Sequence, residues 1–318
     1  MENGSSNRRL PFITIEKAAR QELNYIKGRM DGNINSLLTP WRKFNQASMN
    51  GIEWGSIITV AGMSGSGKTA ILNELETGLF EMNPNEKFAV LSFNFEMMAR
   101  RLVGRKISKN LNITVKQMYN ADLEETSRNL SEAQYQKAIE YAVSIKDTPV
   151  WYVDIPGTVP EIRNTIEHFA MNMPENKERG ILVSLDHSIL VKKFGEQSTL
   201  DVLYSLAAMF NEMKKKIKSS YVIVSQLNRA IESVERKQNK NLHFPQKSDV
   251  FGADALYQYS DIFMITHRPD ILKLRTYGPD EEPVDDLIYW HYLKTRDGDP
   301  FVAKMKNLLK YNRVIDFD

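Results

Sequence analysis

The chain of 318 residues carries 42 Lys and Arg against 40 Asp and Glu, which gives a formal net charge of +2 at pH 7. Because the overall field is so weak, any contact with nucleic acid has to come from local basic patches. The sequence has no Cys, so disulfides, thiolate zinc sites and cysteine nucleophiles are excluded. No run approaches the roughly 18 apolar residues of a membrane span, and the first residues lack the apolar segment of a signal peptide. We expect a cytoplasmic protein without membrane contacts.

The N-terminal part predicts one separate helix. Residues 1–10 are expected to form a flexible tail. From 14 to 29 apolar residues recur at helical spacing, Thr14 is a suitable N-cap, and Gly32 and Asn33 end the pattern. A polar link separates this helix from the rest, so it packs either on something other than its own domain or back on its own core. We divide the chain into 1–34, a tail with a linker helix, and 35–318, the main domain.

The main domain alternates apolar strands with helices. Strands are expected at 56–62, 87–95, 150–155, 180–187, 221–228, 261–268 and 287–296, and helices at 70–82, 161–173 and 200–218. Nearly continuous apolar strands between helices are typical of a parallel sheet that is covered on both faces. The sequence therefore predicts an α/β fold with a mostly parallel central sheet flanked by helices.

The segment GMSGSGKT, residues 62–69, fits the phosphate-binding pattern G-x-x-x-x-G-K-[ST] between a predicted strand and a predicted helix. In this pattern backbone amides and the helix N-terminus surround phosphate oxygens, Lys68 spans the β and γ phosphates, and Thr69 ligates Mg²⁺. We predict an ATP and Mg²⁺ site here; the alternative is an ordinary glycine-rich turn. The residues assigned to nucleotide binding are Gly62, Met63, Ser64, Gly65, Ser66, Gly67, Lys68, Thr69 and Ala70.

Polar residues at the ends of other strands complete the candidate site. Asp186 ends GILVSLD and is the predicted magnesium-side acid, although it could merely cap a turn; Asp154 is weaker because IPG follows it at once. Glu96 follows the strand after the P-loop helix and is the candidate base if that strand adjoins the P-loop strand. Its alternative role is that of an acid in the first turn of a helix. Gln226 could sense the γ-phosphate, or could be a solvated loop residue.

Near the C-terminus, LKTRDGDP places Lys294 and Arg296 two residues apart in a predicted strand, so both side chains point to one face. Taken alone, they could be solvated charges of an edge strand.

Taken together, the segments GMSGSGKTA, LSFNFEMMARRLVGRKIS, ILVSLDH, VIVSQLNR, SDVFGADALYQYSDIFMITHR and LKTRDGDP resemble, in order and spacing, the motif series of replicative hexameric helicases of the DnaB family. The resemblance spans roughly 35–315. It implies a RecA-like P-loop NTPase core and an ATP-dependent hexameric ring that translocates on single-stranded DNA and unwinds duplex DNA. It gives Glu96 the role of catalytic base. It also implies that Lys294 and Arg296 reach the ATP site of the neighbouring subunit, where a cation stabilises charge on the transferring phosphoryl group.

The resemblance also implies a role for the first helix, which in such rings packs on the adjacent subunit. Members of the family carry an additional helical N-terminal domain, for which this chain has no room, so we expect a phage-like or minimal helicase. A primase or a helicase loader is a further expected partner. The location would be the bacterial cytoplasm, or the host cytoplasm for a phage protein.

Two polar loops would face the channel of such a ring. The first, 191–199, contains Lys192 and Lys193, and the second, 229–249, contains Arg229, Arg236, Lys237, Lys240 and Lys247. Lysine and arginine there can follow phosphates without reading bases, although such charge runs are often only solvated. The family usually has a basic residue where Phe251 stands, so that phosphate contact is expected to be lost or moved, while backbone amides from Val250 to Gly252 could still hold a phosphate.

Other readings stay open. A RecA-type or clock-type ATPase would assemble on DNA or protein without unwinding, and a P-loop small-molecule kinase would be a monomer or dimer. His187, His267 and His291 lack metal-ligand spacing, so no zinc site is expected. Met97 and Met98 are expected to pack in the core.

Overall fold

The computed structural model describes residues 11–121 and 129–317 and divides the chain into two compact units, 1–36 and 37–318. The predicted tail at 1–10 lies outside the described residues. In the first unit, helix α1 (Ile15–Met30) begins where the Thr14 hydroxyl accepts a hydrogen bond from the Lys17 amide at 3.2 Å. The predicted helix and its N-cap are therefore confirmed. No residue of α1 is buried, and Ile15, Leu23 and Met30 are exposed.

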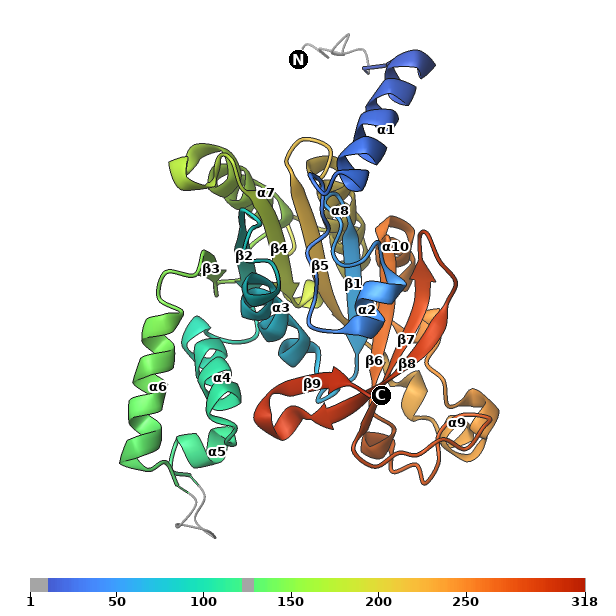
Figure 1. The fold of residues 1–318 in the computed structure, drawn as a ribbon. Coiled ribbons are helices and arrows are strands. Elements are labelled where there is room, and N and C mark those ends of the chain that lie inside the picture. Colours follow the sequence, from blue (N-terminus) through green and yellow to red (C-terminus); the bar gives the residue numbers. More distant parts are fainter. Residues whose placement is uncertain (1–10, 122–128, 318) are drawn as a thin grey trace. The chain divides into compact units, whose positions relative to one another are not determined.

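Within the described part of the second unit, nine strands form one sheet in the order β3-β2-β4-β5-β1-β6-β7-β8-β9 (Figure 1). Neighbours from β3 to β6 pair in parallel, and β7, β8 and β9 continue the sheet in antiparallel fashion. The mostly parallel sheet is confirmed. The strands are β1 (Ile57–Gly62), β2 (Phe88–Asn94), β3 (Val150–Val153), β4 (Gly180–Asp186), β5 (Ser219–Gln226), β6 (Ile262–His267), β7 (Leu287–Thr295), β8 (Phe301–Leu308) and β9 (Arg313–Asp316).

Helices cover both faces of the sheet (Figure 1). One apolar cluster joins the sheet to helices α7, α8 and α10, through residues such as Ile166 and Leu206. A second cluster on the other face includes Phe44 of α2 and Leu75 of α3. The helices of this unit are α2 (Arg42–Ala47), α3 (Lys68–Met82), α4 (Ala99–Leu111), α5 (Val115–Met118), α6 (Glu132–Ser144), α7 (Val159–Glu167), α8 (Thr199–Met213), α9 (Val234–Gln238) and α10 (Ala253–Tyr259).

Several elements differ from the sequence predictions. Strands β8 and β9 and helices α4, α5 and α6 were not predicted, and the helix predicted for 200–218 ends at Met213. Strand β8 is an antiparallel strand near the edge of the sheet, in which buried and exposed residues mix, so it lacks the continuous apolar run of the parallel strands. The helix predicted for 161–173 is regular only over Val159–Glu167 and continues as a wider turn at His168–Asn172. Among the described helices, none is both long and apolar enough to cross a membrane.

Candidate nucleotide site

The phosphate-binding segment lies between β1 and α3, as predicted. Gly67 precedes α3 with φ 100°, a left-handed conformation that favours glycine. The ammonium of Lys68 donates to the carbonyls of Gly62 at 2.8 Å and Met63 at 2.7 Å, which holds the side chain along its own loop. Burial lowers the pKa of Lys68 to about 8, against the opposing effect of the carboxylates of Asp186 and Glu96. The negative charge of a bound phosphate chain would stabilise the charged form of this buried ammonium.

Thr69 and Asp186 meet although they are far apart in the sequence. The Thr69 hydroxyl donates to Asp186 Oδ2 at 3.0 Å, and Asp186 ends β4 with only 3% of its surface exposed. Burial raises the pKa of Asp186 to about 6, whereas the hydrogen bond from Thr69 acts in the opposite direction. Two adjacent oxygen donors fit Mg²⁺, which uses few protein ligands and completes its shell with waters and substrate phosphates. These two residues are therefore suited to hold the ion.

Glu96 reaches the site by a different route from the one expected. Strand β2 does not adjoin β1, because β4 and β5 lie between them. The premise that their adjacency would bring Glu96 to the γ-phosphate is wrong. Instead, Asn94 pairs with Asp186 across β2 and β4, and Glu96 lies two residues beyond that point. Its side chain lines the same cavity as Lys68, Thr69 and Gln226.

His187 joins Glu96 to Gln226, and sequence reasoning missed it. Its Nε2 lies 3.9 Å from Glu96 Oε2 and 3.4 Å from Gln226 Nε2. Burial lowers the pKa of His187, so near pH 7 the ring is neutral and its contact with Glu96 is not an ion pair. The only sequence signal was its position directly after Asp186. The ring of His187 therefore borders both side chains, although its 3.9 Å contact with Glu96 is too long for a hydrogen bond.

Arg105 is a second residue that the sequence predictions missed. It lies on α4, lines the nucleotide cavity beside Glu96 and Gln226, and is half-buried. Burial lowers the pKa of Arg105, and the carboxylates of Asp186 and Glu96 oppose that shift. Among the described residues no carboxylate lies at ion-pair distance from it, and an Arg remains charged in proteins. Arg105 is therefore a free cation at the cavity wall.

The neighbouring methionines differ from expectation. Met97 lines the nucleotide cavity, and Met98 is exposed at the start of α4, so the prediction that Met98 packs in the core is wrong. The alternative acid, Asp154, lies beyond β3 and accepts a hydrogen bond from the Ala99 amide at 3.3 Å. It serves the start of α4 and not the nucleotide cavity.

Lys294 and Arg296 lie where the parallel strands begin, whereas the P-loop of the same chain lies where these strands end. Thr295 pairs with Ile262, and Ile262 pairs with Ile58 near the start of β1, whereas the P-loop leaves β1 at Gly62. From Ile58 to Gly62 is four residues, about 13 Å along a strand. Neither cation can therefore complete the nucleotide site of its own chain.

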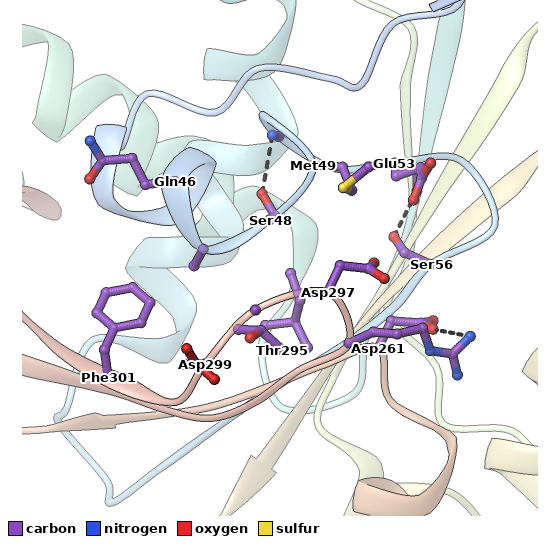
Figure 2. A pocket seen from close by; sticks show the side chains of 15 residues that line it. Gln46, Ser48, Met49, Glu53, Ser56, Asp261, Thr295, Asp297, Asp299 and Phe301 are labelled. Atoms are coloured by element: carbon purple, nitrogen blue, oxygen red, sulfur yellow. Dashed lines mark hydrogen bonds and ion pairs between the residues drawn. The ribbon is translucent and has the colours of Figure 1, made fainter. Parts of the chain in front are cut away.

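Asp261 anchors this second group of charges. One carboxylate oxygen accepts from the Ile57 amide at 2.8 Å and from the Lys214 ammonium at 3.0 Å, and the other pairs with Arg296 at 2.9 Å (Figure 2). The side chain of Arg296 is 58% exposed. The Lys294 ammonium donates to the Tyr257 carbonyl at 2.8 Å, and burial, helped by the charge of Arg296, lowers its pKa. The guanidinium of Arg296 is thus paired with Asp261 while most of the side chain is open to solvent.

Some of the residues predicted to bind DNA are exposed, and others already form an ion pair. Lys192, Lys193 and Arg229 are exposed. Lys247 pairs with Asp254 at 2.6 Å and lies over the ring of Tyr257. The second loop also folds more than expected, since it contains α9.

Two other basic residues of the second loop are already paired with carboxylates. Arg236 is turned inward, where it pairs with buried Asp249 at 2.6 Å and donates to the carbonyls of Leu242 and Phe244. Lys240 pairs with exposed Glu281. Arg236 therefore has a structural role in this loop.

Two of the three backbone amides proposed to hold a phosphate are already used. The Val250 amide donates to the Lys247 carbonyl at 3.1 Å, and the Phe251 amide donates to the Gln226 carbonyl at 3.0 Å. The Gly252 backbone is left-handed, and an added Cβ would lie 2.1 Å from Leu203 Cδ1, so only glycine fits. The Phe251 ring is 40% exposed. This segment is thus tied directly to the end of β5, where Gln226 faces the nucleotide cavity.

A P-loop, an acid at the end of β4 and a polar residue at the end of β5, on a mostly parallel sheet, define a P-loop NTPase with the RecA-like fold. Comparison with known proteins agrees. Residues 37–315 match the DnaB-like helicase C terminal domain, and the chain belongs to that family.

The individual relatives share only a small part of their sequence with this chain. The replicative DNA helicase DnaB of Mycoplasma genitalium is 25% identical over 265 residues, which are 80% of this chain and 52% of the relative, so the chain spans about half the length of that protein. Among solved structures, the ATPase domain of G40P has a TM-score of 0.77 at 17% identity and covers 97% of this chain and 100% of its own. A DnaB-like replicative helicase, described with its interactions with primase, has a TM-score of 0.76 at 17% identity, over 97% of this chain and 68% of its own.

Proposed function

We propose that this chain is the ATP-driven motor of a replicative DNA helicase, which assembles as a hexameric ring, translocates on single-stranded DNA and unwinds duplex DNA. The observation that carries the proposal is the cavity in which the P-loop, Glu96, Gln226 and Arg105 meet in a member of the DnaB-like family. A bound Mg²⁺ would neutralise charge on the β and γ phosphates.

Each side chain of the cavity has a chemical role in this proposal. Lys68 binds the phosphate chain, and Thr69 and Asp186 hold the ion between them. Glu96 accepts a proton from the attacking water, since its carboxylate is exposed to the cavity. Gln226 and Arg105 contact the γ-phosphate, whose charge increases as the bond to the leaving group breaks.

The nucleotide site is completed in trans in this proposal. Lys294 and Arg296 cannot serve their own P-loop, which lies at the other edge of the sheet, but they can serve the P-loop of a neighbouring copy. A cation that arrives only from a docked neighbour makes hydrolysis depend on assembly. The exposed apolar side chains of α1 are suited to pack on the adjacent subunit as a linker helix, with 1–34 as linker and 35–318 as motor domain.

The DNA path in this proposal follows the loops after β4 and β5. Lys192, Lys193 and Arg229 are exposed and can follow phosphates, together with Lys247 of the second loop and the backbone of Gly252 just after it. The hydrogen bond from the Phe251 amide to Gln226 supports a link between nucleotide and DNA. A primase is a candidate partner, since a similar structure is described with one, and a helicase loader is another. We propose a cytoplasmic location.

Two measurements test the proposal against its alternatives. Strand displacement on a forked duplex should require ATP; DNA-stimulated hydrolysis without displacement would favour a RecA-type or clock-type ATPase. Mass measurement with ATP and Mg²⁺ should give six subunits, whereas a monomer that turns over ATP at full rate would favour a kinase. Arg296→Ala should retain ATP binding and lose about 10³-fold or more of its hydrolysis rate. Normal hydrolysis by this variant in the presence of DNA would refute the trans site.

A further inference from the structure

The turn between β7 and β8 carries two exposed carboxylates directly after Arg296. Asp297 and Asp299 are exposed at the rim of the cavity that also contains Asp261 and Thr295 (Figure 2). Neither forms an ion pair with another described residue of its own chain. We call residues 296–300 the acidic turn. A pair of solvated carboxylates beside a cation has no structural role within the chain that carries it.

A basic hollow of about 490 Å³ borders the nucleotide cavity. Its cations are Arg101, Arg105, Lys116 and Lys310, and among the residues that the structure describes no Asp or Glu lines it. Arg101 lies over the Tyr119 ring, and among the described residues none of the four has a carboxylate partner. The hollow and the nucleotide cavity share the residues Met97, Arg105, Leu309 and Asn312. A ligand that fills the hollow therefore lies beside the bound nucleotide.

We propose that the acidic turn of a second copy of this chain seats in the basic hollow and thereby guides Arg296 to the nucleotide. This inference rests on the proposed function, because it supplies the docking surface that a trans Arg296 needs. Asp299 is three residues from Arg296, a span of at most about 10 Å. A turn that places Arg296 against the γ-phosphate therefore brings its carboxylates within reach of the adjoining hollow. Opposite charges at such a rim fix orientation and speed encounter.

Charge complementarity between the acidic turn and the hollow favours a second copy of this chain as the occupant. Within the described residues, Asp297 and Asp299 have no ion-pair partner and the hollow that adjoins the nucleotide site has no acid in its lining. The acidic turn also flanks the residue that has to enter the neighbouring site. Nucleic acid is the other polyanion that could bind there. If so, reversal of charge in the hollow would weaken DNA binding and leave turnover without DNA unchanged.

The test uses charge reversal on the two surfaces of the full chain. Asp297→Lys with Asp299→Lys sets cations against the basic hollow, and Arg101→Glu with Lys116→Glu leaves the hollow with two cations and two carboxylates. Each double variant should lower ATP turnover at saturating ATP by about tenfold or more, because the attraction between turn and hollow is then lost. Binding of a fluorescent ATP analogue and the far-UV circular dichroism should stay unchanged, since all four side chains are exposed. The matched control for the first variant is Asp280→Lys with Asp285→Lys, the same charge change at exposed positions outside both surfaces.

Mixing the two variants gives the decisive result. The first variant alone sets cations against cations, and the second alone sets the acidic turn against a hollow without net positive charge. In a ring that alternates the two, the new Lys side chains face the new Glu side chains at one kind of seam, and the unmodified turn faces the unmodified hollow at the other. An equimolar mixture should therefore recover roughly half or more of the ATP turnover of the unmodified chain.

Two results would overturn the proposal: reversal variants as active as the control, or a mixture no more active than its components. If Arg296→Ala is inactive while the mixture fails, the trans site stands and only this docking is wrong. If Arg296→Ala is active, the trans site of the proposed function fails together with this docking.

Discussion

A buried ion pair under the nucleotide site gives the sharpest prediction about stability. The Lys106 ammonium of α4 lies 2.8 Å from Glu76 Oε2 of α3, and their side chains are 2% and 1% exposed. Lys106 also donates to the carbonyl and side-chain oxygens of Asn73, while Glu76 accepts from Ser92 and Tyr152. Burial lowers the pKa of Lys106, and Glu76 opposes that shift. The pair fixes α4, which carries Arg105, against the helix that follows the P-loop.

Removal of one partner of the pair should lower the free energy of unfolding far more than removal of both charges. Lys106→Met leaves the Glu76 carboxylate buried beside hydroxyl donors only, so we expect a loss of about 3–5 kcal/mol in the free energy of unfolding. Adding Glu76→Gln removes the stranded charge and keeps an acceptor for the hydroxyl of Ser92. The double variant should lie within about 1 kcal/mol of the unmodified chain, because neutral replacement of a buried pair is often close to neutral in stability.

Urea unfolding of the full chain measures both values, at one fixed protein concentration because assembly also contributes to apparent stability. Binding of a fluorescent ATP analogue, measured in parallel, should weaken in Lys106→Met and recover in the double variant as α4 regains its position. A double variant as unstable as Lys106→Met would refute the reasoning. It would mean that the hydrogen bonds of Lys106 to Asn73, and not its charge pair, hold α4.

Three further results are expected. Glu96→Gln should bind ATP normally and lose steady-state hydrolysis, because an amide cannot accept the proton from water; retained turnover would move the base elsewhere. Affinity for Mg²⁺ and ATP should fall as pH drops through about 6, because Asp186 then takes up a proton. The nucleotide-free protein should instead gain stability from Asp186 as the pH falls from about 6 towards 4, because the pKa of this group is higher in the folded than in the unfolded chain. Titration at several pH values and unfolding without nucleotide check the two signs, and Asp186→Asn should remove both. Lys192→Ala with Lys193→Ala should weaken binding of single-stranded DNA and flatten its salt dependence; an unchanged slope would exclude both from the DNA path.

Much of the nucleotide site could be predicted from the sequence, because parallel strands end at one edge of a sheet. Lys68, Asp186 and Gln226 each follow an apolar strand, so a correct strand assignment also brings their side chains together. The mostly apolar runs of β1, β4 and β5 indicated buried strands, because a strand that is covered on both faces is rich in apolar residues.

Other parts depend on contacts that no local pattern encodes. Arg105 lies on α4, and its place at the cavity follows from the buried pair between Lys106 and Glu76, two residues separated by thirty positions. His187 looked like an isolated histidine, because its partners Glu96 and Gln226 come from two other strands. Such residues become visible only when the order of the strands is known.

The direction of β7 decides whether Arg296 lies near the P-loop of its own chain. The strands that carry the P-loop, Asp186 and Gln226 are parallel, so their functional ends share one edge. Strand β7 runs antiparallel to β6 and therefore delivers Arg296 to the other edge, beside Asp261. A parallel β7 would have ended beside the P-loop, and one copy could then have completed its own site. The reversal at β6 and β7 is thus the feature of the topology that makes hydrolysis in the proposed motor a property of the seam between two copies.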